Sequence, residues 1–123
     1  MLKTLAILLF TAIVELSGPG MQFDSEKYDY GSIKEGTIVT HTFTFKNTGD
    51  QPLIINKISP SCGCLVSYFT KEPIAPGSEG TITVKFNSKS RPIGHNIKSF
   101  LVYSNAVNQP HTIYLRGQIL PKK

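Results

Sequence analysis

From Met21 onward, apolar and polar residues alternate with a period of two, and this alternation constrains the fold more than any other feature. In residues 38–47 (IVTHTFTFKN), one face carries Val39, His41, Phe43 and Phe45, and threonine and lysine side chains occupy the other. Such alternation is typical of a β-strand with one buried and one solvated face. Residues 21–123 contain no convincing stretch with the 3.6-residue period of an amphipathic helix. The sequence therefore predicts an all-β fold.

Further strands are predicted wherever the alternation resumes between turn residues such as Pro and Gly. They cover residues 53–58, 65–69, 81–86, 97–104 and 111–120, with an opening strand at 22–24 or 27–33. About seven to eight short strands in roughly a hundred residues predict an immunoglobulin-like Greek-key β-sandwich. A chain of 123 residues has room for one such domain.

The first twenty residues have the pattern of a secretory signal peptide. A lysine precedes the apolar stretch TLAILLFTAIV (residues 4–14), which is shorter than the roughly 20 residues needed to span a bilayer. Small residues before Met21 predict cleavage between Gly20 and Met21. We therefore expect a signal peptide over residues 1–20 and a domain over residues 21–123, without a transmembrane segment. An uncleaved amphipathic N-terminal helix is the alternative interpretation.

Export places the domain in the periplasm, the cell envelope or the extracellular space, where disulfides persist. The stretch Leu16-Ser17-Gly18 is similar to the start of a bacterial lipoprotein signal, but Pro19 stands where the acylated cysteine is required. A lipid anchor is therefore not expected.

Several short motifs together resemble one bacterial family. They are YDYGSI (28–33), HTFTFKNTG (41–49), SCGC (61–64) and PIAPG (73–77). In combination they are similar to the family called domain of unknown function 1573 (DUF1573). The resemblance implies an exported protein with an immunoglobulin-like fold, similar to Hydin, major sperm protein and pilus-chaperone domains. It implies no activity, and Leu65 replaces the threonine that usually follows the SCGC motif in this family.

Cys62 and Cys64 are the only cysteines of the chain. In an extended strand their Cα atoms would lie roughly 6.6 Å apart, at the far edge of what a disulfide tolerates. A disulfide between them therefore needs a bend, which Gly63 permits. Pro60, just upstream, indicates that the cysteine segment is not a regular strand. Such a small ring would be strained and readily reduced, and it would stabilise the fold little.

Three interpretations of this pair stay open. The leading one is a local disulfide, or two small buried side chains at a crossing between sheets. The second is a redox or thiol-exchange site. The third is a site for Cu(I) or zinc with a histidine as a further ligand. The zinc interpretation is the weaker one, because a structural zinc site needs about four ligands. Besides the two cysteines, the chain offers only His41, His95 and His111 as histidine ligands.

We expect no catalytic or metal-binding role for the remaining polar residues. His41 falls on the inward face of its strand, whereas His95 and His111 are expected at the surface. The acidic residues Asp24, Glu26 and Asp29 are expected to form a solvated edge. The polar loop 87–94 is flanked by four basic residues that could form a basic lip: Lys85, Lys89, Arg91 and Lys98. We expect this lip to be a solvated surface, and the alternative is that it contacts acidic glycan or anionic lipid.

The sequence shows neither a nucleophile elbow nor a phosphate-binding or dinucleotide-binding glycine motif. We therefore expect no enzyme activity, no catalytic residues, no cofactor and no metal. Nucleic acid is disfavoured as a partner. The function predicted is that of an exported binding or structural module whose partner is another envelope or secreted protein. The alternative is a thiol redox or Cu(I)-binding protein that uses Cys62 and Cys64.

Overall fold

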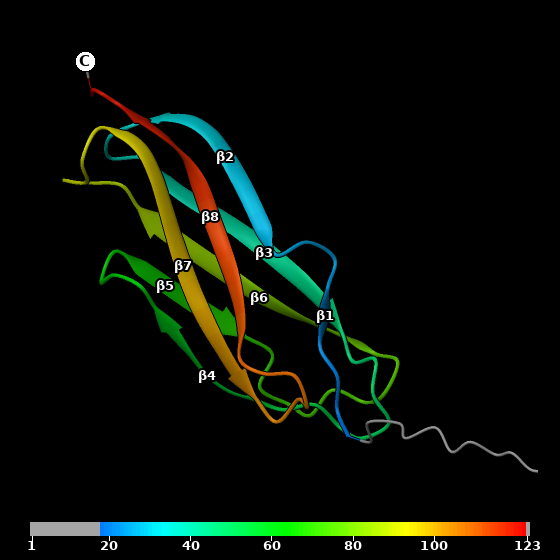
Figure 1. The fold of residues 1–123 in the computed structure, drawn as a ribbon. Coiled ribbons are helices and arrows are strands. Elements are labelled where there is room, and N and C mark those ends of the chain that lie inside the picture. The colour runs from blue at the N-terminus through cyan, green and yellow to red at the C-terminus, as the bar shows by residue number, and fades with distance from the viewer. Residues whose placement is uncertain (1–17, 123) are drawn as a thin grey trace, which may run out of the picture.

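The computed structural model describes residues 18–122, which form two packed β-sheets (Figure 1). Most of the predicted signal peptide, residues 1–17, lies outside the described residues. The eight strands are β1 (Gln22–Phe23), β2 (Lys27–Lys34), β3 (Ile38–Lys46), β4 (Ile55–Pro60), β5 (Leu65–Phe69), β6 (Glu79–Asn87), β7 (Gly94–Ser104) and β8 (His111–Leu120). The prediction of an all-β immunoglobulin-like sandwich is confirmed.

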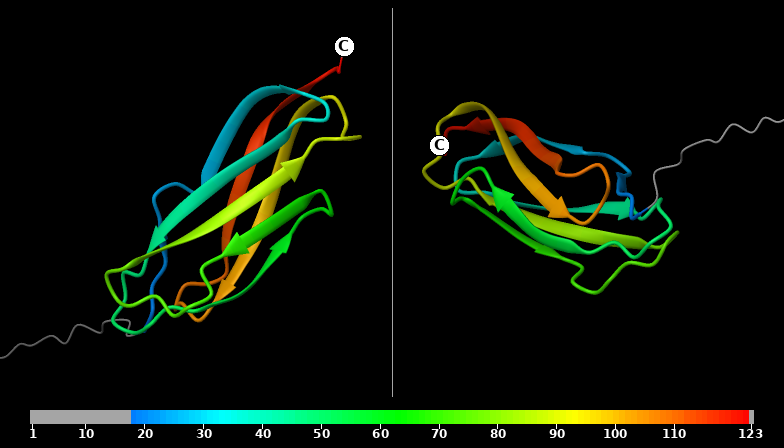
Figure 2. Two further views of the ribbon diagram at one scale, coloured as in Figure 1. Left: turned by 180° about the vertical axis from the view of Figure 1, so that it is seen from behind. Right: turned by 60° about the horizontal axis from the view of Figure 1, so that its bottom comes forward.

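The strand order is β1-β3-β6-β5 in one sheet and β2-β8-β7-β4 in the other. β2 pairs with β8 in parallel, while the other strand pairs are antiparallel. Both candidate opening strands exist, because the chain leaves the first sheet after β1 and joins the second as β2. β4 and β5 also lie in different sheets, so the segment that contains both cysteines crosses between the layers (Figure 2).

The core lies between the two sheets and is built from the inward faces of the alternating strands. On β3, Val39, Phe43 and Phe45 are buried and His41 is half-buried, as the alternation predicts. Phe86 of β6 and Phe100 of β7 are fully buried in the same cluster. Burial of large apolar side chains contributes about 1.5–3 kcal/mol each, and this cluster fixes which face of every strand points outward.

The fourth strand differs most from its prediction. Leu53 forms an isolated bridge with Ile74, and β4 begins only at Ile55. The expectation that the cysteine segment is not regular strand is confirmed, because residues 61–64 form bends and a turn. β4 itself runs to Pro60, which pairs with Phe100. Because β4 is an edge strand, a proline can occupy it without removing a hydrogen bond from the ladder.

The described chain enters at one end of the sandwich and leaves at the other (Figure 1). Within residues 18–122, no helix is long and apolar enough to cross a bilayer. The β4–β5 connection and the β6–β7 loop lie at the end where β8 finishes (Figures 1 and 2).

Candidate functional site

The two cysteines lie in the tight connection between β4 and β5. Their Cα atoms are 5.2 Å apart and their sulfur atoms are joined as a disulfide. A hydrogen bond from the N–H of Leu65 to the carbonyl of Cys62, 3.3 Å long, closes the turn around them. This turn brings the Cα atoms well inside the range in which disulfides form, roughly 4.4–6.8 Å. The redox state of the pair in solution stays a prediction.

Gly63 lies between the cysteines without using the freedom of glycine. Its φ angle is outside the left-handed region, and a Cβ atom built on it would meet no atom within 4 Å. Its backbone is exposed. The bend therefore does not depend on a glycine at this position.

The sulfur atoms differ in their surroundings. The N–H of Cys64 donates a hydrogen bond to Sγ of Cys62, with 2.9 Å between nitrogen and sulfur. Both side chains are half-buried and pack against the hydrophobic core. Of the two cysteines, only Cys64 lines the adjoining surface hollow. A reagent approaching through this hollow therefore meets Cys64.

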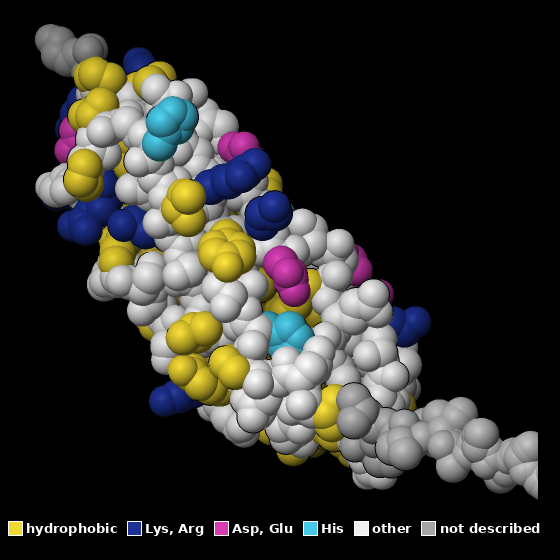
Figure 3. All heavy atoms as spheres, viewed as in Figure 1, with side chains coloured by type: hydrophobic (Ala, Val, Ile, Leu, Met, Phe, Trp, Pro, Cys, Tyr) yellow, Lys and Arg dark blue, Asp and Glu magenta, His cyan; other side chains and the backbone are white. Residues whose placement is uncertain are grey.

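This hollow is open to solvent and has a volume of about 500 Å³. Its walls come from the β4–β5 connection, from β5, and from the loop between β6 and β7. The lining residues are Gly63, Cys64, Val66, Asn87, Lys89, Ser90 and Arg91. Figure 3 shows basic side chains gathered at this end of the molecule. The hollow is thus lined by one of the two cysteines, an apolar residue and two basic residues.

Hydrogen bonds hold the β6–β7 loop in place beside the disulfide. The N–H of Asn87 donates to the carbonyl of Cys64 at 3.0 Å, which joins the two walls. The hydroxyl of fully buried Ser88 donates to the carbonyl of Thr37 at 2.7 Å. The N–H of Ser90 donates to a carboxylate oxygen of Glu35 at 3.0 Å. The sequence shows these residues only as a polar loop, because their partners lie far away along the chain.

The predicted basic lip is divided by the fold. Lys89 and Arg91 line the hollow beside Cys64. Lys85 lies on β6 with its Nζ 5.9 Å from the centre of the Tyr68 ring. Lys98 belongs to β7 in the other sheet. The structure thus places two of the four basic residues next to the cysteine pair, a proximity that the sequence does not reveal.

The three histidines lie on different strands. His41 stacks on Tyr28 with 3.8 Å between ring centres, and burial lowers its pKa. His95 is exposed, as expected. His111 is half-buried and packs edge-on against Phe23, so the expectation of a surface position is wrong. Burial also lowers the pKa of His111, an effect that Glu26 and the Met21 backbone partly oppose. Among residues 18–122, no group of three or more His, Cys, Asp or Glu side chains is arranged to hold a metal ion.

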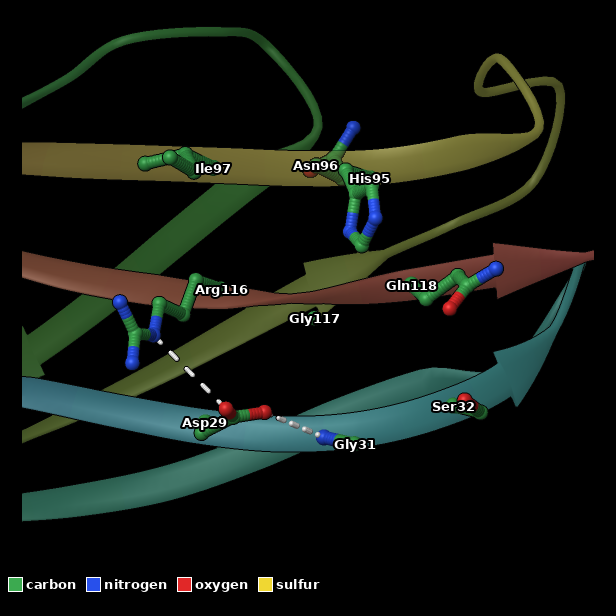
Figure 4. Close-up of a pocket in the computed structure, with 9 residues that line it drawn as sticks. All are labelled: Asp29, Gly31, Ser32, His95, Asn96, Ile97, Arg116, Gly117 and Gln118. Carbon is green, nitrogen blue, oxygen red and sulfur yellow. Dashed lines mark hydrogen bonds and ion pairs between the residues drawn. The ribbon is translucent and has the colours of Figure 1, made fainter.

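A second open hollow, of about 470 Å³, lies on the outer face of β2, β7 and β8 (Figure 4). Asp29 and Arg116 form an ion pair across it, with 3.7 Å between Oδ2 and Nε. Asp29 also accepts a hydrogen bond from the N–H of Gly31 at 2.8 Å. The solvated acidic edge expected at Asp29 therefore includes a cationic partner from β8. Because the two charges lining this hollow neutralise each other, the hollow beside Cys64 is the stronger candidate site.

The outer strands of the two sheets differ in how they are protected against pairing. β1 has only two residues, and β2 and β4 each contain a bulge. β5 keeps a continuous register with β6 and has the sequence LVSYF, without charge or proline. Val66 and Tyr68 on its outer face are 47% and 56% exposed. Natural edge strands usually carry such protective features, and β5 lacks them.

Solved structures with a similar fold share little sequence with this chain. A protein of unknown function from Porphyromonas gingivalis W83 has a TM-score of 0.72 at 16% identity, covering 95% of this chain and 53% of that one. The chain thus spans about half the length of that relative. The ASH/PapD-like domain 7 of human CEP192 has a TM-score of 0.65 at 9% identity, with 95% and 96% of the two chains covered. The periplasmic chaperone SfaE has a TM-score of 0.54 at 11% identity, with 85% and 59% covered.

These likenesses show a PapD-like, immunoglobulin-like fold and nothing further. The sequence matches no curated protein. The family model described as "Protein of unknown function (DUF1573)" matches residues 21–119, which is most of the chain and nearly all of the sandwich. The resemblance seen in the SCGC and neighbouring motifs is thereby confirmed, and the chain belongs to the DUF1573 family.

Proposed function

We propose that this chain is an exported, non-catalytic module that binds another envelope or secreted protein. In this proposal an extended segment of the partner adds to the free edge of β5 and continues the β1-β3-β6-β5 sheet. The single observation that carries the proposal is the unprotected edge of β5. The N-terminal signal pattern and the likeness in fold to a periplasmic chaperone support export.

The hydrogen-bonding groups at this edge follow from the register. Asn87 and Cys64, and Thr70 and Thr81, are joined by backbone hydrogen bonds across β5 and β6. Because such pairs alternate in an antiparallel ladder, Val66 and Tyr68 bond to β6. The N–H and C=O groups of Ser67 and Phe69 then point to the free edge. A partner strand would use these groups for its own hydrogen bonds.

The charges around the edge favour an acidic partner segment. Lys85 lies above Tyr68, and Lys89 and Arg91 lie beyond Val66 at the hollow. Opposite charges across such a contact would raise the association rate and set the preferred partner more than the affinity. The chemistry expected of the partner is an extended segment that alternates β-branched residues with aspartate or glutamate.

Binding is tested with a synthetic peptide in which β-branched residues, valine or threonine, alternate with aspartate. The peptide is titrated into ¹⁵N-labelled protein. We expect chemical-shift changes and slowed amide exchange at Ser67 and Phe69. A Ser67→Pro variant removes an outward N–H without removing a bond to β6, and should weaken binding about tenfold, the effect of roughly 1.4 kcal/mol.

Ser67→Ala is the matched control, because it changes the side chain and keeps the backbone N–H. It should bind the peptide as the wild type does. Shift changes that map to β2 or β4, or equal binding by the Ser67→Pro and Ser67→Ala variants, would exclude β5 as the binding edge. Replacing every aspartate of the peptide by lysine should abolish binding if the basic side chains contribute.

A further inference from the structure

The geometry points to a second function at the hollow, separate from strand addition: the Cys62–Cys64 disulfide is a thiol–disulfide exchange site that is attacked at Cys64. Sγ of Cys64 is the electrophile, and Cys62 leaves as the thiolate. The attacking group is a thiolate on a small anionic molecule or on an acidic protein segment. This inference does not rest on the free edge of β5.

Access decides which sulfur atom is attacked. Cys64 lines the hollow together with Gly63 and Val66, whereas Cys62 does not. Since the exposed backbone of Gly63 carries no side chain, nothing projects from it over the disulfide. Exchange requires the incoming sulfur atom to approach the attacked one, and the hollow provides such an approach on the side of Cys64.

Hydrogen bonding decides which sulfur atom leaves. The N–H of Cys64 already donates to Sγ of Cys62 at 2.9 Å. When the S–S bond breaks, the electron pair moves onto this sulfur atom, and a hydrogen bond to a charged acceptor is stronger than one to a neutral acceptor. A stabilised thiolate is the better leaving group. Access and hydrogen bonding therefore favour the same direction of reaction.

The charges at the hollow select the attacking molecule. Lys89 and Arg91 line it, and Glu35, which accepts the N–H of Ser90, is the carboxylate bonded to the same loop. Two positive charges raise the local concentration of an anionic thiolate at low ionic strength. A cationic thiol would be repelled.

The step balances without another reactant. The incoming thiolate forms a new S–S bond to Cys64, the bond between Cys64 and Cys62 breaks, and the electron pair stays on Cys62 as a thiolate. Attack by a second thiolate on the mixed disulfide releases Cys64. The protein pair is then reduced, and the two incoming thiols are oxidised to a disulfide.

The direction of attack is tested on purified, oxidised protein with glutathione as the anionic thiol. The reaction is quenched with acid within seconds, free thiols are alkylated, and the adducts are located by tandem mass spectrometry. We expect glutathione on Cys64 and the alkyl group on Cys62. Glutathione found mainly on Cys62 would overturn the proposal. So would a pair that stays as two free thiols after treatment with oxidised glutathione.

The role of charge is tested by comparing glutathione with cationic cysteamine at low salt. A Lys89→Gln/Arg91→Gln variant should react about tenfold more slowly with glutathione and no more slowly with cysteamine. The matched control is Lys27→Gln/Lys46→Gln, which removes the same charge elsewhere; Lys46 pairs with Glu79, at the opposite end of β6 from Asn87. Equal slowing in both variants would mean that net charge, and not this hollow, governs the reaction.

A second experiment measures the reaction rate with an acidic peptide that carries one cysteine. It distinguishes a protein partner from a small thiol. Faster reaction with this peptide than with glutathione identifies a protein segment as the preferred attacking group. The Ser67→Pro variant should keep its rate with glutathione, so failure of strand addition and failure of exchange can be told apart.

Discussion

The buried side chain of Asn47 fixes the backbone of Gly20: its Oδ1 accepts the N–H of Gly20 at 3.1 Å. The same oxygen accepts the N–H of Gly49 at 2.9 Å. On the other side of the amide, Nδ2 donates to the carbonyls of Gln51 at 2.7 Å and Ile74 at 2.8 Å. Asn47 is fully buried, so one amide joins the first described residues to two loops at this end of the sandwich.

An Asn47→Asp substitution should destabilise the domain strongly. The carboxylate would keep the acceptor for Gly20, but it would face the carbonyl oxygens of Gln51 and Ile74 and bury a charge. We expect a loss of about 3 kcal/mol in the free energy of unfolding, measured with urea. Asn56→Asp, the same change at an exposed position of β4, is the control and should cost less than about 0.5 kcal/mol.

Residues 18–20 are hydrogen-bonded to the sandwich, and removing them should destabilise the domain. The N–H of Gly18 donates to a carboxylate oxygen of Asp50. The carbonyl of Gly20 accepts the N–H of Thr48, and the carbonyl of Pro19 accepts the N–H of Val107. A chain that begins at Met21 loses these bonds. It should be less stable than one that begins at Gly18 by about 2–3 kcal/mol, since each net bond contributes about 1 kcal/mol.

This comparison also bears on export. A cut between Gly20 and Met21, as the signal pattern predicts, would leave a charged amino group on a residue that is 3% exposed. Intact mass of the protein recovered from the cells that produce it gives the position of any cut directly. Equal stability of the two chains would mean that the hydrogen bonds of Gly18–Gly20 contribute nothing to the fold.

The strands could be predicted because their signal is local. On β3, each inward residue is two positions from the next, and this period alone places Phe43 and Phe45 in the core. The limits of β4 could not be predicted in the same way. Pro60 reads locally as a strand breaker, and only its position in an edge strand, which depends on the pairing with β7, makes it tolerable.

The arrangement of the candidate site could be predicted even less well than the limits of β4. The SCGC motif marks the family, and Lys89 and Arg91 stand out as basic residues, but the sequence gives no reason to join them. They meet because β5 and β6 are paired, with Leu65 opposite Phe86, which brings the β6–β7 loop to the start of β5. Contacts between residues distant in sequence depend on register, and register follows from the whole core.

Removal of the Tyr30 hydroxyl should not destabilise the domain. This hydroxyl is buried and has no hydrogen-bond partner within residues 18–122, and burial, followed by the charge of Asp29, raises the pKa of Tyr30. Its ring packs against Phe86 with 5.8 Å between centres, and phenylalanine keeps this contact. Tyr30→Phe should leave the free energy of unfolding unchanged or raise it by about 1 kcal/mol. A clear loss of stability would reveal a partner for the hydroxyl.

Stability should fall as the pH drops below about 6.5, and His41 should account for part of this fall. Burial holds the pKa of His41 in the folded state below its usual value of 6.5. Between these two values the unfolded chain takes up a proton that the folded chain does not, so protonation favours unfolding. His41→Phe keeps the stacking on Tyr28 and removes the proton site. The urea midpoints of this variant at pH 7.5 and 5.5 should therefore differ less than those of the wild type.

Part of the difference should persist, because burial also lowers the pKa of His111. A His41→Phe variant that keeps the full pH dependence would show that His41 is protonated equally in both states.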